Sequence, residues 1–222
     1  MPISNYTGEE IIDSIIIKQG QKHLDRVWMP RTVFNNPEGK NAFIIGNGES
    51  RIGFNLYSLP QDTYGCNALY RDYEPDYLIV VDQHMYKEIA NSNYGEKNIV
   101  YTNRNNMKKI GGNCHLIPHN PYLGAGTTAM HIAIHDGHTH LFCIGFDCNV
   151  DGPNANVYKD TSCYNDSKTT VYQTVWGKQI FQIMKSNPNI SFTFVGGGQY
   201  LPEPLPNYKK ISYQEFENII NG

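Results

Sequence analysis

The stretch "AFIIGNGESR", residues 42–51, joins a short apolar run to a glycine-rich turn. A run of this kind is typical of a buried strand, and a helical pattern follows it. At the N-terminus of such a helix, backbone N–H groups would gather and bind an anion. Gly46 and Gly48 would allow positive φ and would let a phosphate approach the backbone closely. Asn47 and Ser50 would supply hydrogen bonds to the same group.

Similar apolar runs recur along the chain and alternate with helical patterns. The expected strands are residues 42–45, 77–81, 98–101, 115–117, 140–144 and 190–195. The expected helices are residues 50–59, 83–91, 127–136, 169–185 and 212–220. This alternation predicts a Rossmann-like α/β fold, in which helices cover both faces of a mostly parallel sheet.

The N-terminal forty residues carry a different pattern. In "GEEIIDSIIIKQGQKHLDRVW", residues 8–28, acidic residues come first and apolar residues recur near i, i+3, i+4 and i+7. We therefore predict a helical extension over residues 1–40 and a nucleotide-binding domain over residues 41–222, within a single domain. The polar segment 149–168 is expected to form a lid loop.

Composition limits the function classes. The 222 residues carry 18 Lys and Arg against 21 Asp and Glu, so the charge of -3 gives no broad attraction to nucleic acid or anionic lipid. Five cysteines form no CxxC and no leader-like segment opens the chain, which favours reduced thiols in a cytoplasm. No apolar run approaches the roughly 20 residues of a membrane span, so we expect a soluble protein.

Four further segments place a small residue beside a polar one where an expected strand ends. They are residues 65–67, 81–83, 124–128 and 145–147. In open parallel sheets, ligands bind outside the carboxyl ends of the strands, so these segments are expected to share one site. GxGxxG and GxxxxGK[ST] are both absent, which disfavours a nicotinamide enzyme or an ordinary ATPase.

In this order, "FIIGNGESR", "YGCNALYRDYEPDYLIVVD" and "GAGTTAMHIAIHDGHTHLFCIGFD" resemble segments of the bacterial sialyltransferases that use CMP-sialic acid. They also resemble the related family that includes archaeal hydroxymethyl-dihydropterin pyrophosphokinases. The resemblance spans approximately residues 42–164. It implies a Rossmann-like nucleotide domain and a glycosyltransferase-like enzyme, which passes the sugar of a CMP- or UDP-linked donor to an acceptor hydroxyl. It implies no cofactor beyond the donor.

The resemblance also implies which residues hold the nucleotide. Those residues are Gly46, Asn47, Gly48, Ser50, Asn67, Gly126, Thr127, Thr128, Tyr158 and Tyr164. Asp147 would lie at the nucleotide or the sugar. The two tyrosines would stabilise the departing phosphate without a metal ion, because a phenol is an uncharged hydrogen-bond donor.

Two departures from the family pattern concern the chemistry. Glu49 stands where those transferases have proline, and a carboxylate beside phosphate is unfavourable unless it points outward or pairs with Arg51. The family's general base is a histidine after the lid, and no histidine follows residue 140 here. Asp82, His84 and Asp147 are the remaining candidates, since a base needs only a suitable pKa and hydrogen-bond reach.

Other functions stay open. A Mg²⁺-dependent pyrophosphokinase-like transferase could use Asp82 and Asp147 as hard oxygen ligands. A nucleotide-binding accessory protein without catalysis fits the missing histidine. His131 and His135, four residues apart, could belong to a zinc hydrolase, although their helix is otherwise apolar and favours a packing role. The acceptor is open among glycan, lipid, protein and modified base, and the amphipathic first helix could support a homo-oligomer.

Overall fold

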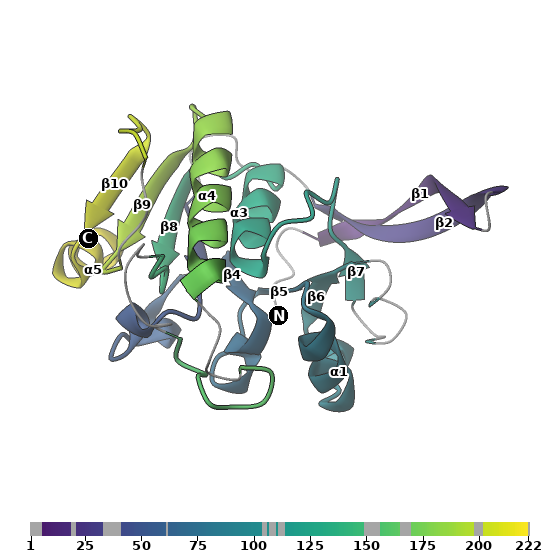
Figure 1. The fold of residues 1–222 in the computed structure, drawn as a ribbon, viewed down its shortest axis with the longest axis horizontal. Coiled ribbons are helices and arrows are strands. Elements are labelled where there is room, and N and C mark those ends of the chain that lie inside the picture. The colour runs from purple at the N-terminus through teal and green to yellow at the C-terminus, as the bar shows by residue number, and fades with distance from the viewer. Residues whose placement is uncertain are drawn as a thin grey trace.

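The computed structural model describes residues 6–18, 21–32, 41–60, 62–103, 106, 110, 114–148, 156–164, 170–197 and 202–221, with only the backbone for 6–32 and 170–174. In this part of the chain, eight strands form one sheet in the order β10-β9-β8-β3-β4-β5-β6-β7 (Figure 1). The strands are β3 (Asn41–Ile45), β4 (Thr63–Cys66), β5 (Tyr77–Val80), β6 (Ile99–Thr102), β7 (Cys114–Leu116), β8 (His140–Ile144), β9 (Ser191–Val195) and β10 (Tyr208–Ile211).

Every neighbouring pair in this sheet is parallel, which confirms the predicted α/β fold of Rossmann-like type. β10 was not expected as a strand, and β4 was expected only through the strand end at residues 65–67, not through an apolar run. β4 has a glycine in its four residues, and β10, "YKKI", carries two exposed lysines at the edge of the sheet. Lysines protect an exposed edge from pairing with other chains, but they also remove the apolar run that marks a buried strand.

Helices cover both faces of the sheet, as predicted. α3 (Ala125–His135) and α4 (Thr170–Ser186) cover one face, and α1 (Gln83–Asn91) and α5 (Tyr213–Asn221) cover the other. Successive residues of β3 serve the two faces, since Ile44 packs in the cluster under α3 and Ile45 in the cluster under α1. Both side chains are fully buried, as expected for a central parallel strand.

The order of the strands reverses beside β3. From β3 the chain builds β4, β5, β6 and β7 outward on one side, and β8, β9 and β10 follow on the other side. The turns after β3 and β8 therefore lie side by side at the point where the strand order reverses. Ligands of open α/β sheets bind at such a switch point.

The prediction of an N-terminal helix was wrong. β1 (Tyr6–Lys18) and β2 (Gln21–Thr32) form an antiparallel hairpin that reaches away from the main sheet (Figure 1). Five of the ten residues from 8 to 17 are isoleucine, whose β-branched side chain favours strands over helices. Gly20, between the two strands, would have cost a continuous helix about 1 kcal/mol. The predicted single domain stays a prediction.

The helix predicted over residues 50–59 is also absent. Two 3₁₀ turns, Glu49–Arg51 and Leu56–Ser58, take its place. Gly53 lies between them at φ +89, a conformation that ends any regular helix. No α-helix therefore begins directly after β3. The anion site expected at the N-terminus of that helix consequently lacks the helix dipole that would attract an anion.

Among the described helices, none is long and apolar enough to cross a membrane.

Candidate functional site

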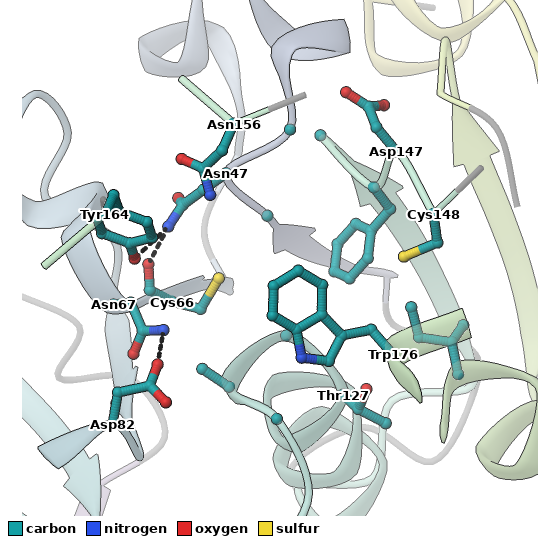
Figure 2. Close-up of a pocket in the computed structure, with 18 residues that line it drawn as sticks. Asn47, Cys66, Asn67, Asp82, Thr127, Asp147, Cys148, Asn156, Tyr164 and Trp176 are labelled. Atoms are coloured by element: carbon teal, nitrogen blue, oxygen red, sulfur yellow. Dashed lines mark hydrogen bonds between the residues drawn. The ribbon is translucent and has the colours of Figure 1, made fainter. Parts of the chain in front are cut away.

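A cavity of about 160 Å³ lies at the carboxyl ends of the central strands, at the switch point (Figure 2). Its walls come from the turns after β3, β4, β5 and β8, from the first turn of α3 and from α4. Nine of the predicted site residues line it: Gly46, Asn47, Gly48, Asn67, Asp82, Gly126, Thr127, Asp147 and Tyr164. Segments that are far apart in the sequence thus meet at the carboxyl edge of the sheet, because each of them follows a strand that ends there.

The glycines after β3 make room for the protein's own chain. A Cβ on Gly46 would lie 2.4 Å from the carbonyl oxygen of Gly145, and one on Gly48 would lie 2.5 Å from Oδ2 of Asp147. Gly48 has φ -70, and neither glycine is among the described residues at positive φ, so these two positions do not use the left-handed conformation that glycine allows. Gly145 is the glycine of this joint at positive φ, +70. The two glycines are therefore explained by the close packing of the β3 and β8 turns.

The backbone amides of the same turn are already hydrogen-bonded. Gly48 N–H donates to the carbonyl of Gly145 at 2.8 Å, and Ser50 N–H donates to Oδ2 of Asp147 at 2.7 Å. Ser50 does not line the cavity, and its buried hydroxyl has no partner among the described residues. An anion would have to displace the Asp147 carboxylate to reach the Ser50 amide, and the Gly48 amide is bonded to the main chain, so neither amide is free to bind the phosphate predicted at this turn.

Two carboxamides on the cavity wall have unused acceptors. Asn47 Nδ2 donates to the Cys66 carbonyl at 3.1 Å and to the Tyr164 hydroxyl at 3.5 Å, and Asn67 Nδ2 donates to Asp82. Each asparagine is only 9% exposed, and its Oδ1 has no partner among the described residues. A buried polar atom without a hydrogen bond is costly. Both oxygens would therefore gain from N–H or O–H donors on a ligand.

The first turn of α3 presents its backbone to the cavity. Ala125, Gly126 and Thr127 line the wall, and no side chain caps this eleven-residue helix. The first amides of a helix lack an intrahelical acceptor and carry the positive end of its dipole. Thr128, predicted to join them, is fully buried, and its Oγ1 donates to the Leu123 carbonyl at 3.2 Å. The N-terminus of α3 is thus the end of the cavity that best suits an anion.

Two carboxylates line the cavity, Asp82 and Asp147, and no Lys, Arg or His does so among the described residues. Burial raises the pKa of Asp82, although the hydrogen bond from Asn67 and the charge of His84 oppose that shift. Asp82 occupies the N-cap of α1 without capping it, because its carboxylate accepts from Asn67 instead. His84, a predicted base, is exposed on α1 and does not line the cavity.

The described part of the predicted lid, residues 156–164, packs on the turn after β3. Val157 N–H donates to the Asn47 carbonyl at 2.8 Å, and the backbones of Asn156 and Gly48 form an isolated antiparallel β-bridge. Lys159 pairs with Glu49 at 2.8 Å, so the carboxylate that replaces the family's proline binds this segment and not Arg51. Residues 149–155 and 165–168 of the predicted lid lie outside the described residues.

The two predicted phosphate-binding tyrosines have different surroundings. Tyr164 lines the cavity, and burial raises its pKa, so its hydroxyl keeps its proton at neutral pH. Tyr158 lies outside the cavity lining, where its hydroxyl accepts from Arg51 at 2.8 Å and donates to Asp72. Tyr164 is therefore placed to contact a ligand, whereas Tyr158 belongs to a network with Arg51 and Asp72, whose side chains are 6% and 46% exposed.

Several lining residues were not among the predicted site residues. They include Cys66, Phe146, Cys148, Asn156 and Trp176. Burial raises the pKa of both thiols to about 12, so they are protonated at neutral pH and poor nucleophiles. Trp176 stands within α4, and a rule that looks at strand ends does not find a residue inside a helix.

The histidines of α3 have protein partners. His131 Nε2 lies 2.8 Å from the Pro118 carbonyl, and the ring of His135 packs against that of His119 at 5.8 Å. No group of three His, Cys, Asp or Glu side chains that could hold a metal ion occurs in the described ranges. The zinc alternative gains no support from these contacts.

Comparison with known proteins found no match among protein-family models, curated proteins or solved structures. The resemblance to sialyltransferases and pyrophosphokinases therefore rests on the short motifs quoted from the sequence.

Proposed function

We propose that the cavity binds a nucleotide-activated sugar, CMP- or UDP-linked, and that the protein transfers the glycosyl group to an acceptor hydroxyl. The observation that carries this proposal is the pairing of two unlike ends in one cavity. The α3 N-terminus suits an anionic group, and the unpartnered oxygens of Asn47 and Asn67 suit N–H and O–H donors. A nucleotide carries a phosphate at one end and such donors on its base, ribose and sugar.

This proposal changes the expected orientation of the ligand. The phosphate would lie against the amides of Ala125 to Thr127, because the amides of Gly48 and Ser50 are already bonded. The ribose or base would face Asn47 and Asn67.

In the transfer step, the acceptor oxygen forms a bond to the anomeric carbon of the sugar as the bond from that carbon to the phosphate oxygen breaks. The negative charge that develops on the phosphate would be stabilised by the α3 amides, whereas the Tyr164 hydroxyl, beside Asn47, would donate to the ribose or base. The acceptor proton passes to a carboxylate. Asp82 and Asp147 are the candidates because both line the cavity, whereas His84 does not.

A second candidate is a Mg²⁺-dependent pyrophosphokinase-like transferase. It is favoured by the two lining carboxylates, which have no lining cation opposite them among the described residues. Oδ1 of Asp147 is buried without a partner there, as an oxygen reserved for a ligand would be. Mg²⁺ held by one or two carboxylates keeps waters and substrate phosphates as its other ligands.

Thermal unfolding with CMP, UDP and ATP, each with and without Mg²⁺, tests both candidates. A ligand at 100 times its Kd stabilises the folded state by about 2.7 kcal/mol. We expect CMP or UDP to raise the Tm without Mg²⁺, and release of free sugar or a glycosylated product from the matching donor.

Asp147→Asn separates the two candidates, since the amide oxygen can still accept from Ser50 N–H. Loss of a negative charge should strengthen metal-free CMP binding by about threefold, but should abolish any binding that depends on Mg²⁺. Binding without turnover of any donor would favour the accessory-protein alternative. A Tm unchanged by every nucleotide would refute all three.

A further inference from the structure

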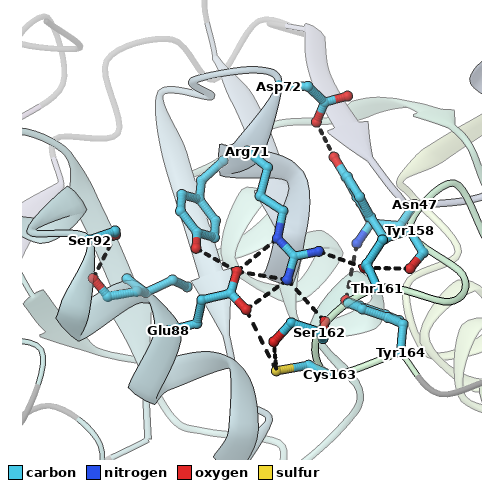
Figure 3. Close-up of polar contacts among 12 residues, drawn as sticks. Asn47, Arg71, Asp72, Glu88, Ser92, Tyr158, Thr161, Ser162, Cys163 and Tyr164 are labelled. Carbon is cyan, nitrogen blue, oxygen red and sulfur yellow. Dashed lines mark hydrogen bonds and ion pairs between the residues drawn. The ribbon is translucent and has the colours of Figure 1, made fainter.

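Arg71 lies outside the cavity but on an element that reaches it. The 3₁₀ turn Asn67–Arg71 begins at a cavity residue and ends at this arginine. Nε and Nη2 of Arg71 donate to Oε1 and Oε2 of Glu88 on α1, each at 2.7 Å (Figure 3). The side chains are 21% and 24% exposed, so this two-pronged pair is largely shielded from solvent.

The same guanidinium also holds the segment 156–164. Nη1 donates to Oγ1 of Thr161 at 2.8 Å, and Nη2 donates to the carbonyl of Ser162 at 3.0 Å. The guanidinium carbon lies 5.5 Å from the centre of the Tyr158 ring. Arg71 therefore joins α1 to the middle of this segment with donors that point in fixed directions.

Both ends of the segment form part of the cavity wall. Asn156 and Tyr164 line the cavity, whereas the residues between them do not. The Tyr164 hydroxyl accepts a long contact from Asn47 Nδ2, 3.5 Å, and a backbone hydrogen bond from Ala68. The backbone of Tyr164 is held by the residues just before it, since its N–H donates to the Thr161 carbonyl at 3.0 Å.

We propose that Arg71 is a positioning residue, which docks residues 156–164 so that Tyr164 closes the cavity wall and contacts the bound nucleotide. The consequence for ligand affinity rests on the proposed function, because it requires that a nucleotide occupies the cavity. Lysine cannot replace Arg71 in this role, since one ammonium group does not reach Glu88, Thr161 and Ser162 in a planar fork.

Hydrogen exchange on the full chain without ligand tests the docking. Arg71→Ala should increase hydrogen exchange in peptides from residues 156–164. Arg71→Lys should retain only part of the wild-type protection of these peptides. Lys185→Ala is the matched control, because it removes the cation of an exposed pair with Glu203, 2.7 Å apart, and should leave this segment unchanged. Unaltered exchange in Arg71→Ala would overturn the proposal, whether or not a nucleotide binds.

A double-mutant cycle with CMP tests the route to the ligand. Arg71→Ala should weaken CMP binding about tenfold in the wild-type background but less than about twofold in Tyr164→Phe, because coupled residues are not additive. Equal losses in both backgrounds would overturn the role assigned to Tyr164. If the wild-type protein binds no nucleotide, the proposed function fails, and exchange alone decides the docking by Arg71.

Discussion

Two glycine-containing turns at the same edge of the sheet do different work. The turn after β3 has its glycines against the backbone and carboxylate of the β8 turn, and its amides are bonded there. The turn before α3 leaves its first amides on the cavity wall, where a Cβ on Gly126 would meet only the edge of the Phe146 ring, at 3.0 Å. A glycine pattern shows that something comes close to the backbone. It does not show whether that neighbour is a ligand or the chain itself.

The largest expected effect comes from adding one methyl group to each turn. Gly46→Ala should lower the free energy of unfolding by about 3 kcal/mol, because its Cβ would overlap a main-chain carbonyl that cannot move aside. Gly126→Ala should change it by less than about 1 kcal/mol, since the Phe146 ring can shift. Urea denaturation measures both. Equal losses would remove the distinction between a structural joint and a ligand-facing turn.

Removal of the Asn47 side chain should affect both stability and binding. Asn47→Ala leaves the Cys66 carbonyl without its donor and should cost about 1–2 kcal/mol of stability. It should also weaken nucleotide binding about tenfold, through the loss of Oδ1. Asn55→Ala is the matched control, because that amide accepts from Tyr57 N–H at an exposed site. Titration calorimetry that found equal affinities in Asn47→Ala and wild type would exclude Asn47 from the site.

Deletion of one hydroxyl on each turn compares the turns in binding alone. Ser50→Ala should leave nucleotide affinity within about twofold of wild type, because its hydroxyl does not line the cavity. Thr127→Val should weaken binding by about threefold, since Thr127 lies in the α3 turn that lines it. The opposite ranking in the same titration would restore the phosphate site that the sequence predicted at the first turn.

The smallest effect concerns Asp82. Burial raises its pKa in the folded protein above the unfolded value of about 3.9, so the folded state binds this proton more tightly. The resulting stability is present below the unfolded pKa and is lost as the pH rises through the folded pKa. Asp82→Asn should therefore be more stable than wild type at pH 7, by less than about 1 kcal/mol because Asp82 is partly exposed.

Urea denaturation as a function of pH tests this prediction. The difference between Asp82→Asn and wild type should disappear below about pH 4. Asp160→Asn is the control, because it replaces an exposed carboxylate that does not line the cavity. If Asp82→Asn were less stable than wild type at pH 7, the carboxylate would stabilise the folded state, and the prediction that its burial destabilises the fold would be wrong.

The sequence by itself determined most of the sheet and the edge at which the polar strand ends meet. Short apolar runs such as residues 140–144 identify strands buried on both faces, and their order with the helices leads to a parallel sheet. Parallel strands end at one edge, so polar residues after the strands, among them Asn67 and Asp147, were correctly expected near one another. Each of these inferences depends on a local pattern and on the general geometry of sheets.

Only the tertiary structure decided which of those residues are free to meet a ligand. The N–H groups of Ser50 and Gly48 donate to acceptors that lie 97 positions further along the chain, and no local pattern reveals such pairing. The N-terminal hairpin was missed for a related reason, since isoleucine-rich segments satisfy helical and extended patterns alike until pairing with another strand selects one. Hydrogen bonds and packing between distant segments thus assigned the roles that the sequence had only made possible.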